Sequence, residues 1–151
     1  MNGHALQILL VEDDDDHAEI VARGLINNRV MNKLRRVSDG EAALDYLLRR
    51  GAYADASLSP RPNLILLDLR LPKVDGLEVL RLVKESVDLR SIPVVVLTTS
   101  DTERDVTAAY QHHANSYLVK PVDFSKFTEM MQTLGFYWMA WNRSPFNEEG
   151  K

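Results

Sequence analysis

Continuous apolar runs separated by polar segments are the main pattern of this chain. In the clearest run, Leu64–Leu67, four apolar residues in succession lead into a single acid, Asp68. Unbroken apolar character, unlike alternation of apolar and polar positions, is typical of a strand that helices cover on both faces. Further runs lie at 6–11, 92–97 and 116–119, with a weaker one at 32–37. The pattern predicts five strands.

Between these runs, apolar residues recur every three or four positions, as they do on one face of a helix. After the first strand, for example, Ala18, Val21 and Leu25 share such a face. Five helices are predicted, each opened by an acidic or hydroxyl capping residue. They are expected to begin near Asp16, Asp39, Asp75, Ser100 and Asp123, with ends at Gly51 for the second and near Val87, Ala114 and Trp141 for the last three.

Strands that alternate with helices predict an α/β fold, because right-handed crossovers then place the strands in parallel. The expected architecture is a doubly wound five-stranded parallel sheet with strand order 2-1-3-4-5. Residues 52–62 are small, polar and proline-bearing, which predicts an exposed loop and a candidate interaction surface. We assign residues 1–142, including a long last helix, to one domain and residues 143–151 to a polar tail.

The composition narrows the class of protein. Of the 151 residues, 45% are hydrophobic and 26% are charged, as in ordinary globular domains. The net charge of -4 argues against a nucleic-acid surface, and the absence of cysteine fits a reducing compartment. No basic signal-peptide region opens the chain, and the longest apolar-rich uncharged stretch, Met130–Asn142, is too short to span a bilayer. We expect a cytoplasmic protein without membrane or nucleic-acid partners.

Polar side chains follow the strands at their carboxyl ends. They are Glu12 and Asp13 on the first strand, Asp68 on the third, Thr98 on the fourth and Lys120 on the fifth. Parallel strands bring these ends to one edge of the sheet, where such folds bind their ligands. Converging carboxylates repel one another unless a cation joins them, and oxygen donors favour Mg²⁺ or Mn²⁺. Because lysine and threonine suit phosphoryl oxygens, the pattern predicts phosphoryl transfer to a carboxylate.

Five motifs make the chain resemble the receiver domain of bacterial two-component response regulators. They follow the order and spacing of that family over about residues 6–135: Leu10–Asp14, Leu67–Pro72, Asp75–Gly76, Pro93–Thr98 and Tyr117–Pro121. The resemblance implies a flavodoxin-like receiver fold and a response regulator phosphorylated by a sensor histidine kinase. Such a protein catalyses its own Mg²⁺-dependent phosphorylation and dephosphorylation and is not a turnover enzyme.

The resemblance also assigns chemical roles to single residues. Asp68 would be the phosphoacceptor. Asp13, Asp68 and the backbone carbonyl of Arg70 would bind the metal ion, with Glu12 contributing through a water molecule. Lys120 would pair with the phosphoryl group. Glu12 departs from the aspartate that many relatives have at its position.

The resemblance further implies a switch. Thr98 would hydrogen-bond the phosphoryl group, and Tyr117 would turn inward as Thr98 moves. This movement would change the surface formed by the helix at 100–114, the strand at 116–119 and the last helix. The segments at 45–48, 52–62 and 97–100 are most similar to single-domain regulators associated with phytochromes, which makes a bacterial phytochrome one candidate for the kinase.

The last predicted helix carries an apolar seam with heptad spacing: Phe124, Phe127, Met131, Leu134, Trp138 and Trp141. One such seam packs a helix on its own sheet. Phe136, Tyr137 and Met139 make the final turns apolar on nearly every side, and a helix of that kind has to be covered. We therefore predict a homodimer through the helix at 100–114 and the last helix; a partner protein or a back-folding tail is the alternative cover.

Other features have simpler interpretations. His17 is predicted to lie on the solvent-facing first turn of its helix, and His112 and His113 to have structural roles. An intermediate phosphate carrier in a phosphorelay is the alternative to a terminal regulator. A metal-dependent phosphohydrolase with an aspartyl nucleophile is disfavoured, because the haloacid-dehalogenase pattern needs another Asp two residues after the nucleophile as acid and base, and Arg70 stands there.

Overall fold

The computed structural model describes residues 6–27, 32–98, 110, 113–120 and 122–133. Within these ranges the strands are β1 (Leu6–Val11), β2 (Asn32–Val37), β3 (Leu64–Asp68), β4 (Val94–Thr98) and β5 (Ser116–Val119). The helices are α1 (Asp15–Asn27), α2 (Gly40–Leu48), α3 (Gly76–Glu85) and α5 (Phe124–Thr133), with short 3-10 turns η1 (Gly51–Tyr53) and η2 (Ala56–Leu58).

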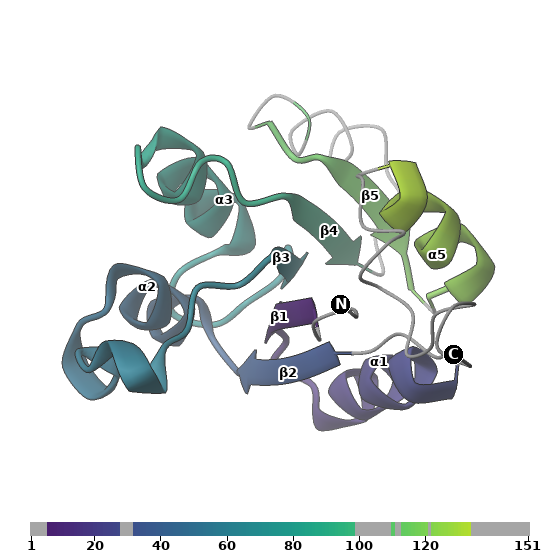
Figure 1. The fold of residues 1–151 in the computed structure, drawn as a ribbon, viewed down its shortest axis with the longest axis horizontal. Coiled ribbons are helices and arrows are strands. Elements are labelled where there is room, and N and C mark those ends of the chain that lie inside the picture. The colour runs from purple at the N-terminus through teal and green to yellow at the C-terminus, as the bar shows by residue number, and fades with distance from the viewer. Residues whose placement is uncertain (1–5, 28–31, 99–109, 111–112, 121, 134–151) are drawn as a thin grey trace, which may run out of the picture.

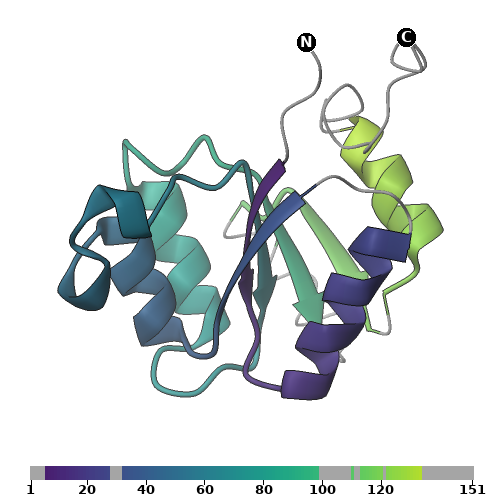
Figure 2. The ribbon, with the colours of Figure 1, turned by 60° about the horizontal axis from the view of Figure 1, so that its bottom comes forward.

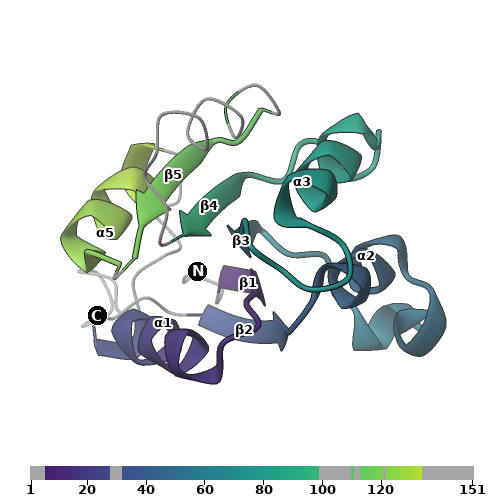
Figure 3. The ribbon, with the colours of Figure 1, turned by 180° about the vertical axis from the view of Figure 1, so that it is seen from behind.

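The described strands form one sheet in which every neighbouring pair is parallel. Their order is β2-β1-β3-β4-β5, which confirms the predicted doubly wound topology. Helices α2 and α3 cover one face of the sheet, and α1 and α5 cover the other (Figure 1). Figure 2 shows the resulting three layers from the side, and Figure 3 shows them from behind.

Each apolar strand contributes side chains to two hydrophobic cores, one on each face of the sheet. On β1, Leu9 and Val11 pack with α2 and α3, whereas Ile8 and Leu10 pack with α1 and α5. The same alternation holds along β3 and β4, because successive side chains point to opposite faces of a sheet. The unbroken apolar runs therefore have the physical cause inferred from the sequence, which is burial on both faces.

Some predicted boundaries were wrong. α1 is capped by Asp14 rather than Asp16, because the Asp14 carboxylate accepts hydrogen bonds from the backbone N–H groups of Asp16 (2.8 Å) and His17 (3.0 Å). α2 ends at Leu48, before Gly51, and its C-cap is Arg49 in the left-handed region with φ 54°. Asp39 caps α2 and Asp123 caps α5, as predicted.

The segment expected as an exposed loop is partly buried. Within 52–62 the Ser59 side chain is fully buried, and the chain folds back on α2 through the Tyr46 hydroxyl, which donates to the Pro60 carbonyl at 2.9 Å. An edge-to-face contact between the rings of Tyr46 and Tyr53 also packs this segment against α2. This part of the chain therefore belongs to the packed domain.

Other predictions fall outside the described residues. These are the helix at 100–114 apart from Tyr110, His113 and Ala114, the structural role of His112, the apolar final turns at 134–141 and the tail at 143–151. None of the helices in the described ranges combines the length and the apolar character that a bilayer span requires.

Candidate functional site

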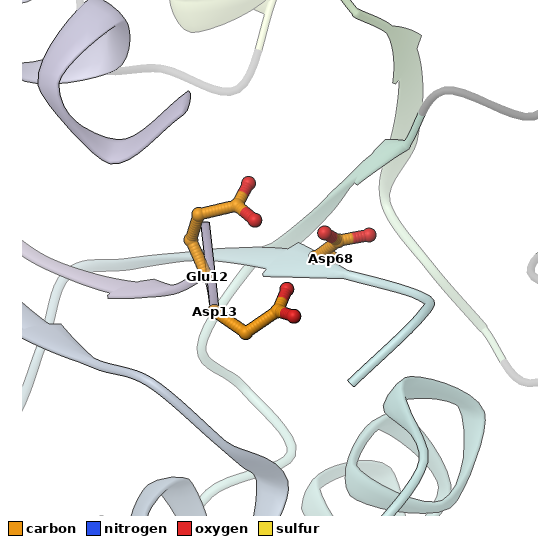
Figure 4. Close-up of side chains that lie close together, drawn as sticks. All are labelled: Glu12, Asp13 and Asp68. Carbon is orange, nitrogen blue, oxygen red and sulfur yellow. The ribbon is translucent and has the colours of Figure 1, made fainter. Parts of the chain in front are cut away.

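The acids that end β1 and β3 meet at one edge of the sheet. β1 and β3 are neighbours with Val11 paired to Leu67, so the residues that follow, Glu12 and Asp68, lie side by side. Carboxylate oxygens of Glu12, Asp13 and Asp68 all lie within 4.8 Å of one another. Figure 4 shows the three side chains gathered at the ends of the two strands. Glu12 and Asp68 are buried, whereas Asp13 is exposed.

Lys120 reaches this cluster from the end of β5. Its ammonium donates to Glu12 Oε1 and, at 3.0 Å, to Asp68 Oδ2, and only 7% of its side chain is exposed. The second oxygen of each buried acid is also occupied: Asp14 N–H donates to Glu12 Oε2 at 3.2 Å, and Arg70 N–H donates to Asp68 Oδ1 at 3.1 Å. The predicted convergence of acids and lysine is thus present.

Burial and neighbouring charges shift the pKa values of both Glu12 and Lys120. Burial raises the pKa of the Glu12 carboxyl, although the hydrogen bond from Lys120 opposes that shift. For Lys120, burial alone favours the neutral amine, but hydrogen bonds to Glu12 and Asp68 outweigh it and raise the pKa of the ammonium. The lysine is therefore a fixed positive charge at this site.

His17 lies at the site, which the sequence interpretation missed. Its Nδ1 is 3.1 Å from Lys120 Nζ and 4.0 Å from Glu12 Oε1, and 37% of its side chain is exposed. The expectation of a purely solvent-facing residue was wrong. In a helix each Cα–Cβ bond tilts toward the N-terminus, so a first-turn side chain of α1 leans back over the end of β1. That direction was the available signal.

The loop between β3 and α3 is held tightly around Asp68. Gly76 N–H donates to the Leu69 carbonyl at 3.0 Å, and a Cβ at Gly76 would lie 2.3 Å from the Asp68 carbonyl oxygen. A Cβ at Gly40 would lie 1.9 Å from the Val74 carbonyl oxygen, so α2 also abuts this loop. Only glycine permits these approaches. They fix the backbone that carries Asp68 and Arg70.

The predicted switch residues lie on the neighbouring strands. Thr98 ends β4 with its backbone paired to Val119, and its side chain is outside the described set. Tyr117, half-buried on β5, packs against the core under α2 and α3. The roles of both residues in switching stay predictions.

The donor set fits a divalent cation. Among the described residues, three carboxylates face a single ammonium, which leaves an excess of negative charge, and every candidate ligand atom of the cluster is an oxygen. Hard cations with oxygen ligands, such as Mg²⁺ and Mn²⁺, match that chemistry. Asp13 is the most accessible of the three acids.

Known proteins share this arrangement of elements. The family model of the response regulator receiver domain matches residues 8–132. The probable methanogenesis regulatory protein FilR2 of Methanothrix harundinacea is 48% identical over 138 residues, 91% of this chain and 86% of that protein. Response regulator Rcp1 of Synechocystis is 46% identical over 132 residues, 87% of this chain and 88% of that protein.

Solved structures agree with the sequence relatives. The Mn²⁺-bound form of response regulator Rcp1 superposes with a TM-score of 0.72 at 45% identity, covering 89% of this chain and 94% of that one. The bacteriophytochrome response regulator AtBRR superposes with a TM-score of 0.81 at 43% identity, covering 93% of this chain and 99% of that one.

Proposed function

The chain belongs to the response regulator receiver domain family, and from this premise we propose that Asp68 accepts a phosphoryl group from a phosphohistidine of a sensor kinase. Receiver domains of this family are signalling proteins that histidine kinases phosphorylate. The observation that carries the assignment is the position of Asp68: it is buried at the end of the central strand β3, beside two further acids and 3.0 Å from Lys120.

The chemistry assigned to Asp68 is an in-line displacement at phosphorus. An oxygen of the Asp68 carboxylate forms the new O–P bond while the N–P bond of phosphohistidine breaks. The electron pair of that bond stays on the imidazole nitrogen of the kinase. Because Lys120 is held as an ammonium, it is placed to pair with the phosphoryl oxygens as they arrive beside Asp68.

A divalent cation, Mg²⁺ or Mn²⁺, completes the proposed site. Asp13, Asp68 and the backbone carbonyl of Arg70 would hold it, with Glu12 acting through water. When bound, the ion neutralises negative charge that develops on the phosphoryl oxygens. The Mn²⁺-bound form of the relative Rcp1 supports this part of the proposal.

Output is proposed to pass through Thr98 and Tyr117 to the face that includes β5 and α5, where a homodimer would form. Phosphorylation changes the protein once per cycle, so the chain acts as a regulator rather than a turnover enzyme.

The likeness to phytochrome response regulators makes a bacterial phytochrome kinase in the cytoplasm the proposed partner. Analytical ultracentrifugation with and without beryllofluoride tests the dimer, and an unchanged monomer would contradict it.

The test of the phosphoacceptor is labelling by a phosphohistidine kinase or acetyl phosphate. Asp68→Asn is expected to lose the alkali-labile label while its circular dichroism spectrum stays that of the wild type, because the amide is not a nucleophile for phosphorus. Asp15→Asn is the matched control: this exposed acid follows the end of β1 close to Glu12 and Asp13, pairs with Arg36, and is expected to label normally. Wild-type labelling of Asp68→Asn would overturn the assignment.

A further inference from the structure

We propose that His17 is a positioning residue for Lys120: its Nδ1 accepts the third N–H of the ammonium and holds it between Glu12 and Asp68. The inference rests on the proposed function, since it concerns the lysine of the same site. The proposal adds a residue of α1 to a site whose other residues lie at the ends of strands.

The donors and acceptors around Lys120 match in number. An ammonium has three N–H groups. Its partners among the described residues are Glu12 Oε1, Asp68 Oδ2 at 3.0 Å and His17 Nδ1 at 3.1 Å. Because 7% of the lysine side chain is exposed, water has little access to replace a lost acceptor.

The proposed contact requires one form of the imidazole ring. A ring nitrogen that accepts from an ammonium carries no proton, so the contact requires the tautomer of His17 with its hydrogen on Nε2. The ring lies beside two groups of opposite charge, the Lys120 ammonium and, at 4.0 Å from Nδ1, the Glu12 carboxylate.

His17 is itself held by the cap of α1. The Asp14 carboxylate accepts its backbone N–H at 3.0 Å, and this bond lowers the pKa of the Asp14 carboxyl. The same Asp14 donates its own N–H to Glu12 Oε2 at 3.2 Å. One turn of chain therefore sets both Glu12 and His17, and with them two of the three acceptors of Lys120.

This arrangement matters when Asp68 is phosphorylated. The ammonium then exchanges the Asp68 carboxylate oxygen for a phosphoryl oxygen, and Glu12 and His17 are the two acceptors that need not change. Without His17, the ammonium keeps one fixed acceptor and loses its orientation toward the incoming group. The effect falls on the phosphorylation rate rather than on metal affinity, because His17 offers no oxygen to the acidic cluster.

The experiment compares three side chains at position 17 by initial rates of labelling with acetyl phosphate at saturating Mg²⁺. His17→Leu, which has no acceptor, is expected to be slower by about tenfold, the lower end of what losing such an outer partner causes. His17→Asn places Oδ1 on the same carbon that bears Nδ1 in histidine and is expected to recover to within about threefold of the wild type. His17→Gln, whose polar atoms lie one bond further out, is expected to recover less.

A spectroscopic measurement on the wild type tests the contact directly. A long-range ¹H–¹⁵N spectrum of the histidines is expected to show His17 as the Nε2–H tautomer with a hydrogen-bonded Nδ1. An Nδ1–H tautomer, wild-type labelling of His17→Leu, or failure of a normally folded His17→Asn to recover would each overturn the inference. Asp68→Asn is assayed in parallel: label that persists there refutes the phosphoacceptor, whereas label lost there but normal in His17→Leu refutes only the role of His17.

Discussion

Polar side chains are buried in two very different places in the described part of the chain. One is the strand-end site, with Glu12 and Asp68; the other is the segment after α2, with Ser59. Burying a polar group is unfavourable unless it finds a hydrogen-bond partner. The two places meet that requirement in opposite ways.

At Ser59 the partners of the buried hydroxyl are neutral carbonyls that lie near in sequence. Its hydroxyl lies 3.1 Å from the Tyr53 carbonyl and 3.3 Å from the Asp55 carbonyl, and its own carbonyl accepts from the Arg49 guanidinium at 3.3 Å. All these partners lie within ten residues along the chain. The segment thus satisfies its own polar groups, and its effect is on stability.

At the strand ends, like charges meet from distant parts of the chain. Lys120 is 108 residues from Glu12 and 52 from Asp68, and it is the cation that faces both buried acids. Two neighbouring carboxylates with one ammonium are an unfavourable way to fill a core, because like charges repel and each is removed from water. Such a cluster is explained by chemistry with charged ligands rather than by packing.

The largest expected effect comes from removing the cation of the strand-end site. Lys120→Met leaves Glu12 and Asp68 buried with no ammonium, so the free energy of unfolding at pH 7.5 is expected to fall by about 3 kcal/mol. The loss should shrink toward pH 5, because removing the lysine hydrogen bond raises the pKa of Glu12 further and protonation then relieves the uncompensated charge. Urea denaturation at both pH values, in metal-free buffer, measures this.

Lys84→Met is the matched control for Lys120. The Lys84 ammonium donates to the carbonyls of Arg90 (3.2 Å) and Ile92 (2.9 Å) and to Asn115 Oδ1 (3.1 Å), which are all neutral acceptors. Its loss is expected to be about 1 kcal/mol with no dependence on pH between 5 and 7.5. Equal losses and equal pH profiles for the two variants would remove the distinction between charged and neutral burial.

The second largest effect on stability is expected in the segment after α2, at Ser59. Ser59→Ala removes the hydroxyl that bonds to the Tyr53 and Asp55 carbonyls, and the free energy of unfolding is expected to fall by about 1 to 2 kcal/mol. The labelling rate with acetyl phosphate should stay that of the wild type, because the hydrogen-bond partners of Ser59 are not residues of the acidic cluster. A folded Ser59→Ala protein with slow labelling would show that the two regions are coupled.

The difference between the regions also explains what could be read from the sequence. The strands and their order were predictable, because burial on both faces leaves unbroken apolar runs such as Leu64–Leu67. Convergence of Glu12, Asp68 and Lys120 then followed from one rule, that parallel strands end at the same edge. Contacts between residues far apart in the sequence were predictable here because the strand order determines which strand ends meet.

Local polar geometry was less accessible. The run Asp13–Asp16 offers several capping residues of equal quality, and only the path of the chain selects Asp14. Arg49 takes the left-handed C-cap conformation that glycine usually adopts, and its guanidinium donates to the Ser59 carbonyl. Burial of Ser59 and the approach of His17 to Lys120 depend on the same kind of detail. Residue type alone specifies none of these contacts.

The smallest expected effect is a gain in the free energy of unfolding rather than a loss. It tests most directly whether the buried charges of the strand-end site destabilise the fold. In Glu12→Gln one of the buried like charges is removed while an oxygen acceptor for Lys120 remains. Because burial raises the pKa of Glu12 in the folded protein, the native state binds more protons than the unfolded state once pH exceeds about 4.5, the ordinary glutamate value. Stability therefore declines as pH rises from there through the raised pKa, and the glutamine variant escapes this decline.

The metal-free Glu12→Gln protein is thus expected to gain about 1 kcal/mol of unfolding free energy at pH 7.5, and almost nothing at pH 4, where the carboxyl is mostly protonated in both states. Glu129→Gln, at an exposed glutamate of α5, should change neither value. Mg²⁺ should stabilise the wild type more than Glu12→Gln, since a ligand at free concentration L that binds the folded state adds RT ln(1 + L/Kd) to stability, and this increment is larger for tighter binding. A loss of stability in Glu12→Gln at pH 7.5 would mean that the Glu12–Lys120 pair stabilises the fold, as the Ser59 hydrogen bonds do, and the contrast between the two regions would fail.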